Sequence, residues 1–340
     1  SELHSKLTAA ISSQQIADVP LGAFLSGGID SSLIVALMQS QSKNPVHTFT
    51  IGFEDAKYNE ANFARDVATH LGTQHTELIV NADQAQEVIP LLPTLYDEPF
   101  ADSSAIPTFL VSQLARREVT VSLSGDAGDE LFAGYNRYQH ASQFANLPKA
   151  YRKALGLTLQ SISPSAWDRA YSVASPLLPK SLQITTPGFK AHKLASVLHC
   201  ESVRELYTNL LSQWLNSAEV VLDNDYKCLI TSQWQDVVDL QSKECKMMAL
   251  DTLGYLPNDI LHKVDRAAMS VSLETRVPFL DHRVIDFAWQ LPHHMKTRNG
   301  QNKWILRQML YKYVPRELIE RPKAGFGIPI GDWLRGTLRD

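Results

Sequence analysis

The chain has 340 residues, which at roughly 150 residues per domain predicts two domains, each able to bury its own core. The 32 Lys and Arg residues against 36 Asp and Glu residues give a net charge of −4, and no basic run is present, which argues against nucleic acid as a partner. No stretch reaches the ~18 apolar residues of a membrane span, and no signal peptide is recognisable. The three cysteines form no C-x-x-C pair, which favours a reducing, cytoplasmic location.

Short β-rich runs alternate with helical stretches from about residue 21 to 138. We expect strands at 21–25, 46–51, 75–80 and 119–123, and helices at 31–39, 60–71, 82–92 and 106–116. This alternation predicts an α/β fold with a doubly wound, mainly parallel sheet. Ligands bind such sheets beyond the carboxyl ends of the strands, so the loops after the first, second and fourth strands are candidate sites.

The rest of the chain has a more helical pattern. Clear strands are missing from about 139 to 242, where prolines separate helical segments, and an amphipathic helix is expected at 260–271, before Pro278. We expect an α/β core over 1–140, a mostly helical insertion or lobe over 141–245, and a helical portion over 246–340 that packs back on the core. Because the chain starts at Ser1 without a methionine, we expect it to be a fragment of a longer polypeptide.

The first motif is the loop SGGIDSS at 26–32, between a predicted strand and a predicted helix. Its glycines let the backbone approach an anion, and the serine hydroxyls and the N–H groups of the helix start can donate to phosphate. Asp30 could also hold Mg²⁺. The alternative is a plain strand-to-helix turn with a serine N-cap, which does not account for Asp30.

The second motif is SLSGDAGDE at 122–130, which follows another predicted strand. Asp126, Asp129 and Glu130 place three carboxylates within five residues, and these repel one another unless a cation is near. The alternative is an exposed acidic turn that caps the following helix. Because this loop and the first motif follow strands of one sheet, we expect both to face one ligand.

The third motif is RPKAGFGIP at 321–329, a loop rich in glycine and proline. Lys323, held between Pro322 and Gly325, could reach a phosphate as a point charge. A surface turn with solvated cations is the alternative.

Together these motifs resemble the synthetase domain of glutamine-hydrolysing asparagine synthetases, which are part of the ATP pyrophosphatase superfamily. Two further blocks share the resemblance, DEPFADSS at 97–104 and the segment from Asp259 to Asp281. The similarity runs from about residue 20 to 329, and the stretch 149–242 adds little to it. It implies a sheet of the adenine nucleotide alpha-hydrolase type with a large helical C-terminal portion.

The resemblance also implies a reaction: ATP adenylates a carboxylate with release of pyrophosphate, and ammonia then attacks the acyl-adenylate. In that family the carboxylate is aspartate and the product is asparagine. The cofactors implied are ATP and Mg²⁺. Position by position, the resemblance assigns the pyrophosphate loop to Ser26, Gly27, Gly28, Asp30 and Ser31, the magnesium ligands to Asp30 and Asp129, and the surroundings of adenine and ribose to Leu25, Ile51, Ser124 and Gly125.

Two catalytic roles follow from the same comparison. Lys323 matches the lysine that stabilises charge on the α-phosphate, and Asp126 stands where well-known members often carry a glutamate near the acyl-adenylate. Charge neutralisation by a metal, a lysine and backbone donors is sufficient for such a transfer. The family's glutaminase domain carries a catalytic cysteine, and no cysteine precedes Cys200 here, so we expect that domain to be absent and ammonia to come from elsewhere.

Other functions remain open from the sequence. Relatives with this fold adenylate another small carboxylate, close β-lactam rings, or amidate sugars and peptides. A nucleotide-binding domain without catalysis is the remaining class, and pyrophosphate release from ATP would distinguish it from the enzymes. A homodimer is compatible with the sequence.

Overall fold

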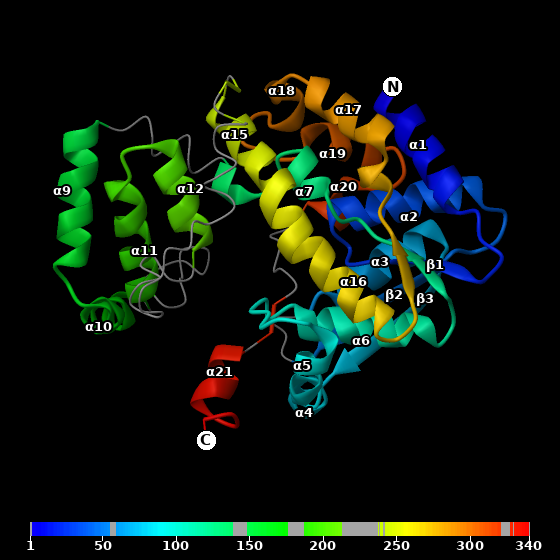
Figure 1. Ribbon diagram of the computed structural model, residues 1–340, viewed down its shortest axis with the longest axis horizontal. Coiled ribbons are helices and arrows are strands. Elements are labelled where there is room, and N and C mark those ends of the chain that lie inside the picture. Colours follow the sequence, from blue (N-terminus) through cyan, green and yellow to red (C-terminus); the bar gives the residue numbers. More distant parts are fainter. Residues whose placement is uncertain are drawn as a thin grey trace. The chain divides into compact units, whose positions relative to one another are not determined.

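The computed structural model describes residues 2–54, 59–138, 148–175, 187–212, 237, 239–240, 242–320, 327–328 and 330–339. The chain forms two compact units (Figure 1). The first combines Ser1–Gly134 with Gly254–Asp340, and the second is Tyr135–Leu253.

A parallel sheet of five strands forms the centre of the first unit. The strands are β1 (Leu21–Phe24), β2 (His47–Phe53), β3 (Gln74–Val80), β4 (Val121–Leu123) and β5 (Glu274–Arg276). Their order is β3-β2-β1-β4-β5, so the winding direction reverses between β1 and β4. At this reversal Gly22 of β1 pairs with Ser122 of β4. The loops that leave β1 and β4 therefore flank the switch point of a doubly wound sheet, where ligands bind in such folds.

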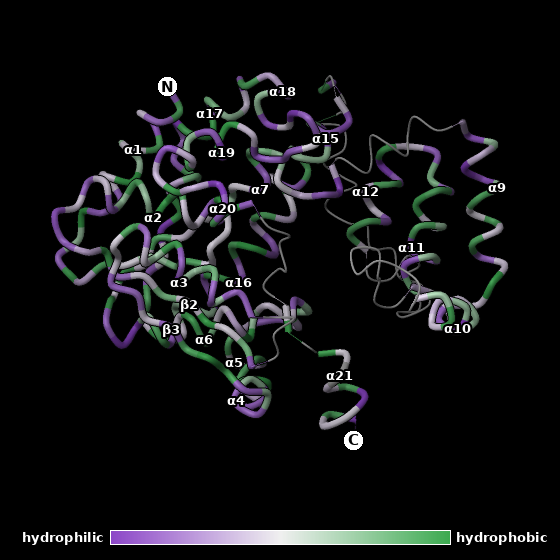
Figure 2. Tube along the Cα trace, turned by 180° about the vertical axis from the view of Figure 1, so that it is seen from behind, coloured by the Kyte–Doolittle hydropathy of each residue, from purple (hydrophilic) through white to green (hydrophobic). Residues whose placement is uncertain are grey.

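Helices cover both faces of this sheet (Figure 1). One face is packed by α1 (Glu2–Gln14), α2 (Ile29–Gln41), α3 (Ala61–Leu71), α17 (His282–Gln290) and α19 (Trp304–Leu310). The other is packed by α4 (Ala82–Gln86), α5 (Leu92–Leu95), α6 (Ala105–Arg116) and α16 (His262–Met269). Shorter helices are α7 (Gly128–Leu131), α18 (His293–Lys296), α20 (Arg316–Ile319) and α21 (Ile330–Arg335). Figure 2 shows apolar residues concentrated along the strands and central helices of this unit.

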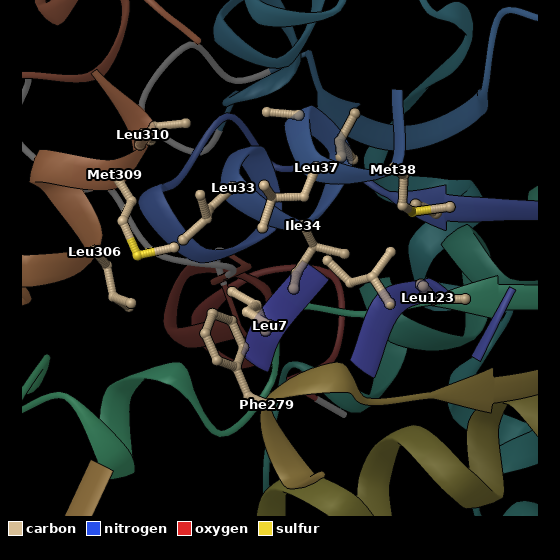
Figure 3. Packing of buried hydrophobic residues seen from close by; sticks show 14 of the residues in the cluster. Leu7, Leu33, Ile34, Leu37, Met38, Leu123, Phe279, Leu306, Met309 and Leu310 are labelled. Carbon is tan, nitrogen blue, oxygen red and sulfur yellow. The ribbon is translucent and has the colours of Figure 1, made fainter. Parts of the chain in front are cut away.

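Helix α2 is deeply buried, since every residue from Ser31 to Met38 is buried. Its side chains meet those of α1, α19, β4 and the turn after β5 in one apolar cluster (Figure 3). The residues shown there include Leu7, Leu33, Ile34, Leu37, Leu123, Phe279 and Met309. A helix that is apolar on nearly all sides has to lie inside the protein, and this fixes the start of α2, which carries the first motif.

The second unit is helical in the part that the structure describes. It contains α9 (Lys149–Gln160), α10 (Pro164–Ala174), α11 (Pro187–His199), α12 (Val203–Leu211) and α15 (Lys243–Leu250). Serine N-caps open three of them: Ser163, Ser202 and Ser242 each accept a hydrogen bond from the backbone N–H three residues on. A π-helical segment, Asp251–Leu261, follows α15 and leads into α16.

The α/β class and the parallel sheet predicted from the sequence are confirmed. The four expected strands correspond to β1 to β4, but β5 was not expected. The helix expected at 82–92 is wrong as one element: α4 ends at Gln86, and a 3₁₀ turn (Ile89–Leu91) and α5 follow, each with a proline in its first turn. No helix in the described ranges is long and apolar enough to cross a membrane.

Candidate active site

The first motif forms a tight loop at the carboxyl end of β1. Ser26 and Ser31 join its two ends, with their Oγ atoms 2.9 Å apart, and the Ser26 N–H donates to Ser31 Oγ at 3.2 Å. Gly27 has a φ of 71°, which favours glycine, and Gly28 is the N-cap of α2 and offers no capping side chain. Because no side chain caps this helix N-terminus, its backbone N–H groups can donate to an anion.

The second motif lies directly against the first. A Cβ atom added to Gly125 would lie 2.7 Å from the Ser31 backbone nitrogen, and one added to Gly128 would lie 2.6 Å from Asp30 Oδ1. Only glycine allows such close approach at both positions. The two loops expected to face one ligand are therefore in contact.

Asp126 is held by its own loop. The Ser124 hydroxyl donates to the Asp126 carboxylate, and the Asp126 N–H donates to Ser124 Oγ at 3.1 Å. Ala127 then takes a left-handed conformation, with φ 67°, and α7 begins at Gly128. Of the three acidic residues in this motif, Glu130 is fully buried, whereas Asp126 and Asp129 are half-buried.

Asp30 and Asp129 converge on one cation, the ammonium of Lys303. Its Nζ lies 2.6 Å from Asp129 Oδ1 and also forms an ion pair with Asp30 Oδ2. The side chain of Lys303 is 5% exposed. Burial alone would lower the pKa of this lysine, but the carboxylates of Asp129 and Asp30 raise that pKa above its usual range, so the ammonium stays charged.

The two carboxylates fit a divalent cation, because both already bind a single positive group from two different loops. The described residues hold no cluster of three or more His, Cys, Asp or Glu side chains arranged for a metal. A magnesium ion between Asp30 and Asp129 would take its remaining ligands from water and phosphate oxygens, which is the usual manner of Mg²⁺.

Lys303 was missed by the sequence analysis. It stands at the N-cap of α19, some 170 residues after Asp129, in a segment without glycine-rich or acidic character. The only local signal is a lysine immediately before an apolar helix.

The four residues expected around adenine and ribose come from three segments of the sheet unit. Ser124 and Gly125 are in the contacting loops, and Ser124 is 3% exposed. The side chains of Leu25 and Ile51 are buried in the apolar clusters of opposite sheet faces. Leu25 directly follows the end of β1, whereas Ile51 lies inside β2, where it pairs with Leu78 of β3.

Lys323 lies outside the described residues, together with the rest of 321–326. The residues on either side are well anchored: Glu320 accepts from Arg307 and from the Tyr311 hydroxyl. On the far side of this segment, Ile328 is buried in the apolar cluster that contains Ile51.

The two further blocks of the family resemblance also meet. Lys263 of α16 donates to Asp102 Oδ2 at 2.6 Å and to Ser104 Oγ at 2.7 Å. Burial alone would raise the pKa of Asp102, but the charge and hydrogen bond of Lys263 lower that pKa below its usual value. The pair joins α16 to the start of α6.

A family model and several curated proteins that match this chain carry the same description. The family model described as Asparagine synthase matches residues 2–340. The chain is 31% identical to glutamine-hydrolyzing asparagine synthetase 1 of Bacillus subtilis (strain 168), over 100% of this chain and 51% of the relative. It is 32% identical to a putative enzyme of the same description from Mycobacterium bovis, over 98% and 49%, and 26% identical to the human one, over 93% and 41%. The chain spans about half the length of these curated relatives.

Proposed function

The chain belongs to the asparagine synthase family, and from this premise we propose that it adenylates the side-chain carboxylate of aspartate with ATP and transfers ammonia to the acyl group, giving asparagine, AMP and pyrophosphate. The observation that carries the proposal is a contact at the switch point of the sheet. There the loop at 26–32, which suits phosphate, touches the loop at 122–130, which carries carboxylates suited to a metal.

The proposed roles of the residues are those that the family resemblance implies. The Ser26–Ser31 loop and the N-terminus of α2 bind the pyrophosphate portion of ATP, and Leu25, Ile51, Ser124 and Gly125 surround adenine and ribose. Asp30 and Asp129 hold Mg²⁺, which supplies charge neutralisation on the phosphates when bound. Lys323 stabilises the charge that develops on the α-phosphate.

Asp126 is proposed to act on the ammonia nitrogen. Its carboxylate is oriented by Ser124, within the same loop that touches the pyrophosphate cradle. An oriented carboxylate there can attract ammonium and take a proton as the C–N bond forms. The nitrogen source is proposed to be ammonia delivered by a glutaminase domain; the relatives are named as glutamine-hydrolyzing enzymes.

Exchange of labelled pyrophosphate into ATP tests this function. We expect exchange that depends on aspartate, and formation of asparagine when an ammonium salt is added. Asp30→Asn should lower exchange by about 10²–10³, the cost of losing one preorganised charge contact. Asp286→Asn, at an exposed position of α17, is the matched control and should leave exchange unchanged.

A panel of other small carboxylates completes the test. Exchange driven by a different acid and not by aspartate would reject the proposed substrate but retain adenylation. Absence of exchange with every acid, in protein that is folded, would reject the enzymatic function itself.

A further inference from the structure

Lys303 places a positive charge where the proposed function needs a magnesium ion. Its Nζ contacts Asp30 and Asp129 together, with the carboxylates 15% and 18% exposed and the lysine side chain 5% exposed. Two cations at bonding distance from the same pair of oxygens repel strongly in such poorly solvated surroundings. The ammonium and a metal ion therefore exclude each other at this position.

The backbone of Lys303 is fixed, and its side chain is the part that can move. Lys303 has a left-handed φ of 54°, and its neighbours hold that strained geometry: the Asn302 amide donates to the Gly134 carbonyl at 3.1 Å, and Arg307 Nε donates to the Asn302 carbonyl at 2.8 Å. Lysine carries its charge on a flexible four-carbon stem, so the ammonium can move away while the helix start stays in place.

Gly134 shows how closely this region is packed. A Cβ atom there would overlap both Asp129 and the Lys303 stem. The lysine stem and Asp129 thus pack directly against the Gly134 backbone, which is closer packing than an incidental surface ion pair would require.

We propose that Lys303 is an exchangeable counter-cation, whose ammonium competes with Mg²⁺ for Asp30 and Asp129 and has to move away when the metal binds to them. The inference rests on the proposed function, which assigns magnesium to these two carboxylates. The lysine keeps the two loops together without metal, and it weakens metal binding in the absence of nucleotide. Metal binding is then favoured when a polyphosphate offers the displaced ammonium new negative partners.

Binding of Mn²⁺ alone tests the proposal without nucleotide, aspartate or ammonia. Calorimetry or the spin-resonance signal of free Mn²⁺ would compare the wild-type chain with Lys303→Met. We expect the variant to bind Mn²⁺ at least about tenfold more tightly, the size of an ordinary coupling between two ligands. Lys296→Met is the matched control, because Lys296 is also buried in the first unit but lies over the Trp289 ring, and it should bind Mn²⁺ like the wild type.

A second measurement uses the unmodified chain and holds even if the variant fails to fold. Lys303 should resist acetylation in metal-free protein and become reactive as Mg²⁺ is added, whereas Lys296 should stay protected, as followed by mass spectrometry.

Tighter metal binding by Lys303→Met, or metal-dependent labelling of Lys303, supports exchange. Equal Mn²⁺ affinity in a folded variant, or constant protection of Lys303 at metal saturation, would make it a permanent structural ion pair. Neither result depends on which carboxylate drives pyrophosphate exchange, so this inference and the proposed function can fail separately.

Discussion

Gly125 is the residue that lets the second loop lie on the start of α2. The position that a side chain would take is already filled by the Ser31 backbone, 2.7 Å away, and by the Asp30 carbonyl carbon, 3.0 Å away. Backbone atoms cannot give way as the end of a flexible side chain can. The contact of the two loops therefore depends on the absence of a single methyl group.

Gly125→Ala should lower both stability and activity. Forcing one methyl group into this contact is expected to cost about 1–3 kcal/mol of unfolding free energy and to separate the loops, so pyrophosphate exchange should fall with it. The urea midpoint and the exchange rate measure the two effects.

Gly331→Ala is the control for that substitution. Gly331 lies in α21, and its nearest neighbour would be the Arg335 guanidinium at 3.4 Å, so alanine should be neutral or stabilise the helix by about 0.5–1 kcal/mol. A wild-type midpoint for Gly125→Ala would mean that the loops are not in contact in solution.

The sequence predicts the site residues that carry local signals and misses those that do not. Asp30 and Asp129 stand beside glycines at the ends of apolar strands, so their meeting could be predicted from the strand pattern. Lys303 has no such signal, because its partners are distant in sequence and only the packing of α19 on α2 brings them together. The position of Lys323 relative to the nucleotide stays a prediction.

At the level of elements, too, strands with a local sequence signal can be predicted and strands without one cannot. The strands β1, β2 and β4 are short segments rich in apolar residues and are mostly buried, and this composition is visible in the sequence. Strand β5 has the residues Glu274, Thr275 and Arg276, and no periodicity marks it as a strand. It forms because it pairs with β4 and because Arg276 donates to the carbonyls of Gln14, at the end of α1, and of Ile16, and neither partner is local.

Within the second unit, a buried carboxylate joins three elements. Asp251, at the start of the π-helical segment, is fully buried and accepts from Arg137 Nε at 3.0 Å, from the Tyr207 hydroxyl at 2.6 Å and from the Tyr138 hydroxyl. Arg137 and Tyr138 follow the second motif in sequence, and Tyr207 belongs to α12. A buried charge of this kind is tolerated only when it is fully paired.

Asp251→Asn should therefore destabilise this unit strongly. The substitution keeps the shape but leaves the Arg137 guanidinium without its counter-charge, which is expected to cost about 3–5 kcal/mol. Tyr207→Phe removes one donor and should cost about 1 kcal/mol. Unfolding in urea, followed by circular dichroism, measures both, and Asp239→Asn at an exposed position of the same unit is the control. Equal midpoints for all three variants would show that the cluster contributes nothing to stability.

At the scale of the whole molecule, the candidate site is assembled from distant parts of the first unit. The first two motifs come from the amino-terminal part of the sheet unit, whereas Lys303 comes from the segment that returns after the second unit. All of the groups proposed to bind ATP and metal belong to this one unit. We therefore expect the residues of this chain to carry out both adenylation and the transfer of ammonia. Release of ammonia from glutamine requires a different group, an activated nucleophile.

The family resemblance implies that an activated cysteine carries the hydrolysis of the glutamine amide, and Cys200 of this chain is poorly suited to that role. Cys200 is 3% exposed, and burial raises its pKa to about 11, so little thiolate exists at neutral pH. Cys245 is half-buried within α15, and Cys228 lies outside the described residues. We predict that the 340-residue polypeptide forms asparagine with an ammonium salt but not with glutamine.

Paired assays of asparagine formation and glutamate release check this prediction. With ammonium, the wild-type chain and a variant carrying Cys200→Ser, Cys228→Ser and Cys245→Ser should form asparagine at similar rates, because none of the three thiols takes part in adenylation or in the attack of ammonia. With glutamine, neither protein should release glutamate. Glutamate release by the wild-type chain that disappears in the triple variant would show that one of these thiols is an activated nucleophile, and that the chain supplies its own ammonia.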